Sequence, residues 1–353
     1  MLLNADYITP QELTGYSRAA LADMEVNKFK LAMWLPSLNV DDLEYRFNRG
    51  GSGLIEAGTF RGFDVESPIA GRKGLKRVTG ELPPLSRKIR LGEYDRLRQR
   101  AMAARSEGGD DDPIVRQLEN DGEQMARALG ARIELARADA MFNSSVTIAE
   151  EDMFVKVDFD RKAEHSRVAA VAWSSVDTAT ALSDELAAVE VYNDTNGRPP
   201  EVVLMPRTTR ALLTRNIEYR QLASRLGGNV PARISLEEVN GIREDNDLPA
   251  IVLYDAKVEV NRVATRITPL NDVLYLPAPG DASDPETGPL GNTFWGTTSE
   301  SLEPEYGLQG NEPGIAVGTY KVPNPLAIWT NAAGISLPCP ANPDLTLRLT
   351  VRS

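Results

Sequence analysis

An apolar stripe marks the longest helix predicted from the sequence, over residues 112–142. Asp112 stands at an N-cap position and Pro113 at the first helical position, where a missing N–H costs nothing. Apolar side chains then recur at helical spacing, at Ile114, Leu118, Met125, Leu129, Ile133, Ala136 and Ala140. The other faces are polar, with Arg116, Glu119, Glu123, Arg127, Arg132 and Arg137. The stripe is narrow, so we expect this helix to lie across a surface rather than inside a core.

Two segments far apart in the chain alternate apolar and polar residues, the pattern of a strand with one wet face. In residues 153–160, Val155, Val157 and Phe159 alternate with charged residues. Near the C-terminus, residues 345–351 place Leu345, Leu347, Leu349 and Val351 on one face. The similar character of the two segments predicts that they pair in one sheet.

The stretch between these strands reads as a mixed lobe of helices and strands. Helices are predicted over residues 178–191, 206–215 and 217–226, and strands over 201–205, 251–255, 258–260 and 273–276. Residues 277–314 are rich in Pro and Gly and are expected to be loop-like. These elements predict a lobe of the α/β or α+β class.

The N-terminal quarter of the chain shows no core of its own. Thr9 to Glu12 form a capping box that opens a helix over residues 10–23, and the apolar segment 28–35 ends at Pro36. These apolar residues must dock on the rest of the chain or on a neighbouring subunit. Residues 46–92 read as a long two-stranded excursion with its tip at 71–77 and a return strand over 78–89, interrupted by Pro83 and Pro84.

Charge is distributed unevenly along the chain. The 353 residues contain 39 Lys and Arg against 51 Asp and Glu, a formal net charge of −12. Residues 61–105 nevertheless hold 12 basic against 5 acidic residues, whereas residues 281–312 hold 7 acidic residues and no Lys or Arg. The basic excursion is either a solvated flap or an arm on another subunit, and its lack of interleaved aromatics disfavours single-stranded nucleic acid. The basic excess of residues 61–105 and the acidic excess of residues 281–312 suggest complementary contacts between copies of the chain.

The composition excludes several common kinds of catalytic and structural site. One Cys and one His cannot supply a zinc site with four such ligands, nor an internal disulfide. His165 lies in a polar stretch and is expected at the surface or in a turn, and Cys339, between two prolines, in a turn or at an edge. Asp110 to Asp112 are explained by the dipole of the following helix rather than by a metal. No phosphate-binding, dinucleotide or GxSxG motif occurs, so we assign no catalytic, cofactor-binding or metal-binding residue and no cofactor.

Nothing in the sequence indicates export or membrane insertion. The N-terminus lacks a basic segment followed by a long apolar stretch. The longest apolar run, residues 168–173, is far shorter than the about 20 residues of a spanning helix. We therefore expect a soluble protein made in a reducing cytoplasm.

Element order and four short strings resemble a known family. The strings are Leu31–Pro36, Leu82–Arg90, Pro325–Trp329 and Pro343–Leu347. With the succession of arm, excursion, long helix and mixed lobe, the chain resembles the lambda-type major capsid protein E family of tailed bacteriophages, which has the Hong Kong 97 type fold. The resemblance implies an N-terminal arm (1–45), an extended β-hairpin loop (46–92), a spine helix with the first part of a peripheral domain (93–175), an axial domain (176–315) and return strands of the peripheral domain (316–353).

The resemblance also implies a function. It implies a non-enzymatic subunit of an icosahedral head, assembled in the host cytoplasm into hexamers and pentamers that enclose double-stranded DNA, without sequence-specific binding or a membrane. Scaffold, portal and decoration proteins are further partners in such heads. Some relatives cross-link Lys to Asn, but no motif assigns that role here to Lys73, Lys76, Asn324 or Asn331. The alternatives are an encapsulin-like compartment shell and, from another class, a carboxylate-dependent α/β hydrolase.

Overall fold

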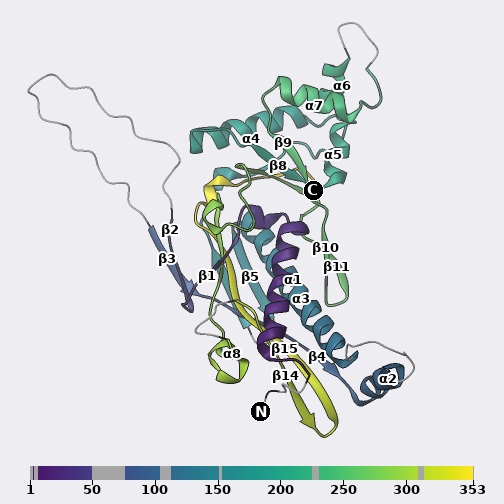
Figure 1. Ribbon diagram of the computed structural model, residues 1–353. Coiled ribbons are helices and arrows are strands. Elements are labelled where there is room, and N and C mark those ends of the chain that lie inside the picture. The colour runs from purple at the N-terminus through teal and green to yellow at the C-terminus, as the bar shows by residue number, and fades with distance from the viewer. Residues whose placement is uncertain are drawn as a thin grey trace, which may run out of the picture.

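The longest strand, β15 (Leu326–Pro340), organises the first of two five-stranded sheets. The computed structural model describes residues 3, 7–49, 76–103, 113–150, 153–224, 230–308 and 314–352. Within them, β15 pairs antiparallel with three strands, β4 (Pro84–Leu91), β13 (Gly291–Trp295) and β14 (Ala316–Pro323). A short parallel strand, β1 (Ser37–Asn39), extends the sheet beyond β13. Mixed helices and sheets confirm the predicted α+β class (Figure 1).

Two helices cover this sheet. α3 (Pro113–Asn143) packs against β15 and β4, and α1 (Pro10–Asn27) packs against α3 and β14 (Figure 1). The prediction of a long helix over 112–142 is confirmed, but its expected surface position is wrong. The helix is covered on more than its narrow stripe, since Ala126, Glu134, Arg137 and Met141 are buried as well. The physical reason is that buried ion partners make polar positions compatible with a core, as described below.

The apolar N-terminal residues dock on their own chain. Phe29, Leu31, Trp34 and Leu35 are buried in the core between α1, α3 and the sheets. The Trp34 indole N–H donates a hydrogen bond to the Pro277 carbonyl oxygen at 2.9 Å. Residues 28–35, which include a 3₁₀ turn over Leu31–Met33, are therefore an integral part of the first core.

The second sheet carries a layer of helices. Its order is β7 (Ser166–Val168), β16 (Leu347–Thr350), β12 (Asp272–Leu276), β8 (Val202–Met205) and β9 (Ala250–Leu253). One face is covered by α4 (Ala181–Asn196), α5 (Arg207–Leu213), α6 (Ile217–Ala223) and α7 (Leu236–Asp245), seen in teal and green in Figure 1. A separate hairpin, β10 (Lys257–Val260) with β11 (Val263–Arg266), projects beside it.

Strand β8 joins the two cores because both of its faces are buried. Val202 and Leu204 pack into the core that contains α1 and α3, whereas Val203 and Met205 pack under the helices α4 to α7. Successive strand residues point to opposite faces, so a strand buried on both sides reads as an unbroken apolar run. β12 repeats this arrangement in the neighbouring position of the sheet.

The two alternating segments do not pair with one another, so that prediction is wrong. β6 (Met153–Asp158) forms a hairpin with β5 (Ser145–Glu150), its neighbour in sequence. β16 lies between β12 and β7 in the second sheet. Alternation specifies which face of a strand is apolar but not which strand lies beside it. A sequence-adjacent partner was available to β6, and it forms the pair.

The excursion predicted over residues 46–92 begins and ends differently from the expectation. β2 (Glu44–Arg49) pairs antiparallel with β3 (Lys76–Glu81), which gives a two-stranded ribbon. Residues 50–75, including most of the predicted tip, lie outside the described residues. The predicted return strand divides at Leu82–Pro83, because proline lacks an N–H for the ladder, and a new strand begins at Pro84. Residues 84–91 then pair with β15 in the first sheet rather than with the ribbon.

The Pro- and Gly-rich stretch 277–314 is not only loop. It contains β13, a 3₁₀ turn over Pro285–Thr287 (η3), the short helix α8 (Ser299–Leu302) and a second 3₁₀ turn, η4 (Pro304–Tyr306). Gly291 opens β13 with a φ of +143°, and a Cβ there would lie 2.5 Å from the Cys339 carbonyl oxygen. Glycine is therefore required where β13 begins to pair with β15, and it does not signal a loop.

Candidate assembly surfaces

The β2–β3 ribbon extends away from the body and is fixed at its base (Figure 1). Tyr45 of β2 is buried beside Leu82 and Val146, in a small core under the first sheet. Its ring lies across Gly80 of β3, where a Cβ would approach the Tyr45 hydroxyl oxygen to 2.4 Å. The ribbon therefore leaves the body in a direction set by one aromatic side chain packed on a glycine.

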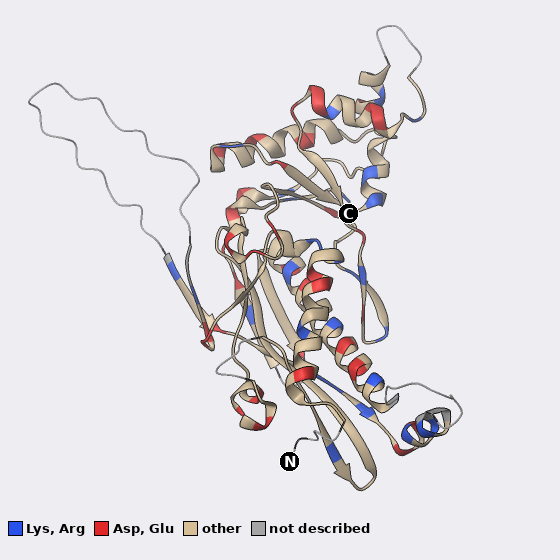
Figure 2. Ribbon diagram, viewed as in Figure 1, with Lys and Arg blue, Asp and Glu red and all other residues tan. Residues whose placement is uncertain are grey.

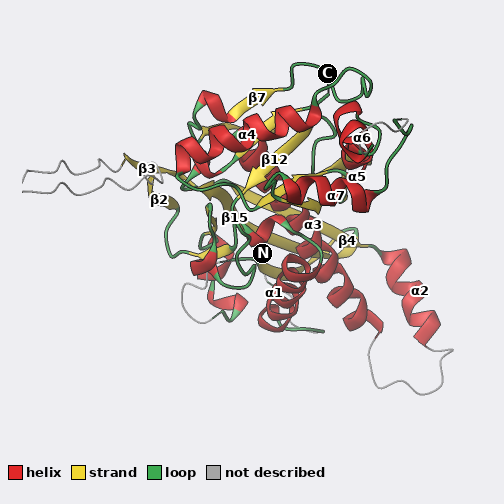
Figure 3. Cartoon of the chain, turned by 90° about the horizontal axis from the view of Figure 1, so that it is seen from above, coloured by secondary structure: helices red, strands yellow, loops and turns green. Residues whose placement is uncertain are grey.

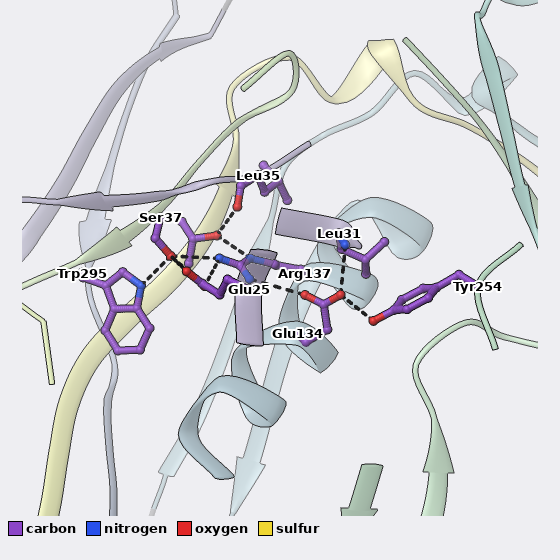
Figure 4. A network of polar contacts seen from close by, with 9 residues as sticks. Glu25, Leu31, Leu35, Ser37, Glu134, Arg137, Tyr254 and Trp295 are labelled. Carbon is purple, nitrogen blue, oxygen red and sulfur yellow. Dashed lines mark hydrogen bonds and ion pairs between the residues drawn. The ribbon is translucent and has the colours of Figure 1, made fainter. Parts of the chain in front are cut away.

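A buried ion network fixes α1 against α3 and β13 (Figure 4). An Arg137 Nη2 to Glu25 Oε1 distance of 2.6 Å joins the two helices, and both side chains are buried. The Arg137 Nε–H donates to the Thr293 hydroxyl at 2.9 Å. The Ser37 hydroxyl accepts from Arg137 at 3.0 Å and donates to Glu25 at 2.8 Å. One guanidinium thus connects residues that are more than 100 positions apart in sequence.

Glu134 extends the network toward the second sheet. Its carboxylate lies 3.4 Å from an Arg137 guanidinium nitrogen. It also accepts hydrogen bonds from the Leu31 backbone N–H at 3.0 Å and the Tyr254 hydroxyl at 2.7 Å. Tyr254 directly follows β9, so this carboxylate links the N-terminal segment, the long helix and the second sheet (Figure 4).

Burial and neighbouring charges shift the pKa values of Glu134 and Arg137 in opposite directions. Burial raises the pKa of the Glu134 carboxyl, although Arg137 and the donated hydrogen bonds oppose the rise. Burial alone would lower the pKa of Arg137, but Glu25 and Glu134 outweigh it and raise the pKa above its ordinary value. The guanidinium is therefore charged, and its removal would leave carboxylates inside the core without a counter-ion.

A basic helix with exposed apolar side chains stands out from the body beside the first sheet. α2 (Glu93–Ala103) projects beyond α3 in two perpendicular views (Figures 1 and 3). Tyr94 is 74% exposed and Leu97 is 67% exposed. With Ala101 they follow a spacing of three and four residues, which places them on one face of the helix. The Glu93 carboxylate accepts from the Leu326 N–H at 3.0 Å, and the Arg96 guanidinium donates to Tyr7 at 3.5 Å, which fixes α2 to the body.

An acidic corner lies on the opposite side of the same end of the molecule. α8 and η4 carry three carboxylates, at Glu300, Glu303 and Glu305, and Leu302 is 58% exposed among them. Figure 2 shows this red corner and the blue helix α2 on either side of the β14–β15 hairpin. Tyr306 packs over Gly318 of β14 and anchors the corner. Burial, aided by nearby Glu300, raises the pKa of Tyr306 to about 12.

Sequence reasoning did not single out these two surfaces as apolar. The spacing of Tyr94, Leu97 and Ala101 is typical of one face of a helix. It was overlooked because residues 61–105 were interpreted through their charge alone. Leu302 lies in a helix of four residues, too short for any periodicity to appear. Exposure in the folded structure is what distinguishes these side chains from core residues.

His165 is fully buried, so its expected surface position is wrong, although it does lie in a 3₁₀ turn (η2, Ala163–His165). Its Nδ1 is 3.0 Å from the Thr346 carbonyl oxygen and donates to it. Burial lowers the pKa of the imidazole, and that bond opposes the change. The physical reason for the burial is the C-terminal segment, which folds back over the turn.

Cys339 is the last residue but one of β15, so it lies in a strand and not in a turn. Among the described strands, residues 336–340 pair with β13 alone, so Cys339 does lie at an edge of the sheet, as expected. It is paired with Asn292 of β13, and it is buried among apolar side chains, which raises the pKa of the thiol well above its usual value. A protonated, inaccessible thiol is a poor nucleophile. Pro338 and Pro340 are compatible with this strand because, among the described strands, this part of β15 has a neighbour on one side only, and proline is tolerated in an edge strand.

The remaining residues considered for chemistry are dispersed. Asn324 lies in the turn between β14 and β15, Asn331 lies within β15, and Lys76 begins β3. Lys73 and Asp110 to Asp112 lie outside the described residues. Among the residues that the structure describes, no group of three or more His, Cys, Asp or Glu is placed to hold a metal ion. Over the same residues, no helix has the length and hydropathy needed to cross a membrane.

The chain is similar to known proteins in sequence and in structure. The family model of the phage major capsid protein E matches residues 52–351. A prophage protein of Escherichia coli CFT073, assigned as a capsid protein, is 14% identical with a TM-score of 0.62, over 98% of this chain and 100% of that chain. A phage-related protein of Bordetella bronchiseptica RB50 is 12% identical with a TM-score of 0.54, over 99% and 97% of the two chains. No curated protein matches the chain.

At these identities the two structures establish a shared fold and nothing further, whereas the family model covers most of the sequence. The expected resemblance is confirmed by that match. With 300 of its 353 positions inside the matched range, the chain belongs to the phage major capsid protein E family.

Proposed function

We propose that this chain is the subunit of an icosahedral bacteriophage head that self-assembles into hexamers and pentamers around packaged double-stranded DNA. The observation that carries the proposal is the family match over residues 52–351. The described surfaces support it, because the β2–β3 ribbon, α2 and the α8–η4 corner project from the body with exposed charged or apolar side chains. Such features suit a protein that makes contacts with copies of itself.

The role that we propose is structural and not enzymatic. The sole Cys and His of the chain are buried and take part in packing. The buried charge cluster around Arg137 is inside the core and holds helices together. DNA would be contained without sequence-specific binding, since a net charge of −12 disfavours tight contact with phosphates. Scaffold, portal and decoration proteins are the further partners that a head of this kind would use.

We also infer how the chain divides into the parts expected for this family. The first sheet with α1, α3 and the β5–β6 hairpin would form the peripheral domain. The second sheet with α4 to α7 would form the axial domain. The C-terminal strand β16 would then belong to the axial domain, and β13 to the peripheral domain. The extended loop would begin at the β2–β3 ribbon.

Electron microscopy of the purified full chain tests the proposal. We expect rings or closed shells with pentamers at the fivefold vertices and hexamers between them, and shells filled with double-stranded DNA when they are isolated from a phage-producing host. Monomers alone, under every assembly condition tried, would contradict the proposal. Closed shells that hold a protein cargo and never DNA would indicate a cellular compartment instead.

A further inference from the structure

The two projecting surfaces at the β14–β15 end have opposite charge. α2 carries three basic residues, Arg96, Arg98 and Arg100, against two acidic ones, Glu93 and Asp95, and β4 directly before it adds Arg87, Lys88 and Arg90. The α8–η4 corner, from Ser299 to Tyr306, carries three acidic residues, Glu300, Glu303 and Glu305, and no Lys or Arg. Figure 2 shows α2 and the α8–η4 corner on opposite sides of the molecule, so they cannot meet within one chain.

Each surface also exposes large apolar side chains among its charges. Tyr94 and Leu97 on α2, and Leu302 on α8, are each more than half exposed. Exposed apolar side chains rimmed by polar and charged residues are typical of a surface that a partner covers. Both surfaces are anchored, α2 through the bond from Glu93 to Leu326 and the corner through Tyr306 on Gly318. They are therefore presented in a fixed orientation.

We propose that the outer face of α2 in one copy binds the α8–η4 corner of the next copy in a ring. The inference rests on the proposed function and specifies one of its contacts. Two different patches on opposite sides of a subunit form a heterologous contact, which can repeat around a ring until it closes. Arg98 and Arg100 would face Glu303 and Glu305, and Tyr94 and Leu97 would cover Leu302. Charge complementarity would fix the register of neighbours.

Charge reversal of exposed residues tests this contact in the full chain. Arg98 and Arg100 are exposed on α2, and Glu303 and Glu305 are exposed at the corner. We expect Arg98→Glu with Arg100→Glu to lower the yield of rings or shells by about tenfold or more, because like charges would then face one another. Glu303→Lys with Glu305→Lys is expected to have the same effect. All four substitutions in one chain restore opposite charges, and the yield should return to within about threefold of the original.

A matched control carries the same change of net charge at a distance from both surfaces. Arg198→Glu with Lys257→Glu alters two exposed residues near the second sheet, and we expect it to assemble like the original chain. Circular dichroism and thermal melting of each unassembled variant establish that it is folded. Rescue by the fourfold variant, with a normal control, supports the proposal.

Three results would overturn it: normal assembly of either reversed pair, a fourfold variant no better than the reversed pairs, or an equal loss in the control. A fourfold variant that stays unassembled would indicate another occupant for one of the surfaces, such as a separate scaffold or decoration protein. These failures concern one contact only. The proposed function itself fails when the original chain forms no rings or shells.

Discussion

Arg137 shows how a charged side chain becomes part of a core. It is fully buried on α3, and it is held by Glu25, Glu134, Ser37 and Thr293. A second buried pair, Glu185 with Arg243 at 2.5 Å, joins α4 to α7 above the second sheet. Buried pairs of this kind add little net stability compared with apolar residues, but removal of one partner is costly. We interpret these buried ion pairs as contacts that determine which helices and strands pack against each other.

At the residue scale, Arg137→Leu should destabilise the folded chain by about 3–5 kcal/mol, because Glu25 and Glu134 lose their counter-ion inside the core. Urea unfolding of the unassembled chain measures the loss. Arg132→Leu is the matched control on the same helix. Arg132 pairs with Glu150 at the surface, and its replacement should cost less than about 1 kcal/mol. Equal losses in the two variants would refute the role assigned to the network.

Among the elements, β14 depends on a helix for part of its hydrogen bonding. β14 pairs with β15 along one edge, and α1 packs near the other. The buried Thr14 hydroxyl of α1 donates to the Val317 carbonyl oxygen at 2.9 Å and accepts from the Val317 N–H at 3.0 Å. One side chain thus satisfies both backbone groups of a strand residue. It protects an edge that would otherwise offer unpaired groups.

Thr14→Val tests this arrangement at the scale of the element. The substitution keeps the shape of the side chain but leaves both Val317 groups without their partner, so we expect a loss of about 2–3 kcal/mol in the free energy of unfolding. Thr147→Val makes the same chemical change at an exposed position of β5, and it should stay within about 0.5 kcal/mol of the original chain. Amide exchange of β14 should also accelerate in Thr14→Val alone. Unchanged protection of Val317 would contradict the assignment.

On the scale of the whole molecule, the body and its projections have separate roles. Two sheets share a continuous interior, because β8 and β12 contribute alternate residues to both cores. From the described part of the β2–β3 ribbon, Tyr45 belongs to a buried cluster and Val78 packs against it. We therefore expect the body to fold without residues 50–75, a prediction tested below.

Removal of residues 50–75 tests that separation. Arg49 and Lys76 are directly opposite one another in the β2–β3 register, so a two-residue Asn-Gly turn can join them. We expect the shortened chain to fold with a melting temperature close to that of the original and to form rings or shells poorly. Analytical ultracentrifugation and electron microscopy measure the outcome. Normal shells from the shortened chain would show that the segment makes no essential contact with a neighbour.

Local patterns in the sequence predicted most elements correctly. The capping box of Thr9 with Glu12 opens α1 as expected. The apolar run over 202–205 is a buried strand, and the stripe from Ile114 to Ala140 is one helix. These signals depend on residues within one or two turns of each other, so they can be read without knowledge of the fold. The helices α2 and α7 were missed because their sequences are dominated by charged residues.

Sequence alone determined the class, the order of the elements and the lack of a recognisable catalytic motif. Tertiary structure decided which strands are neighbours and which polar residues are buried. Arg137 and Glu25 are 112 positions apart, and β4 meets β15 across more than 200 residues. Alternating residues in a strand and apolar stripes on a helix predict which face of the element is buried, but not which element packs against that face. A charged residue in the sequence does not reveal that its counter-ion lies elsewhere in the chain. Only the packed chain brings these residues within hydrogen-bonding distance, and only there do α2 and α8 stand exposed on opposite sides.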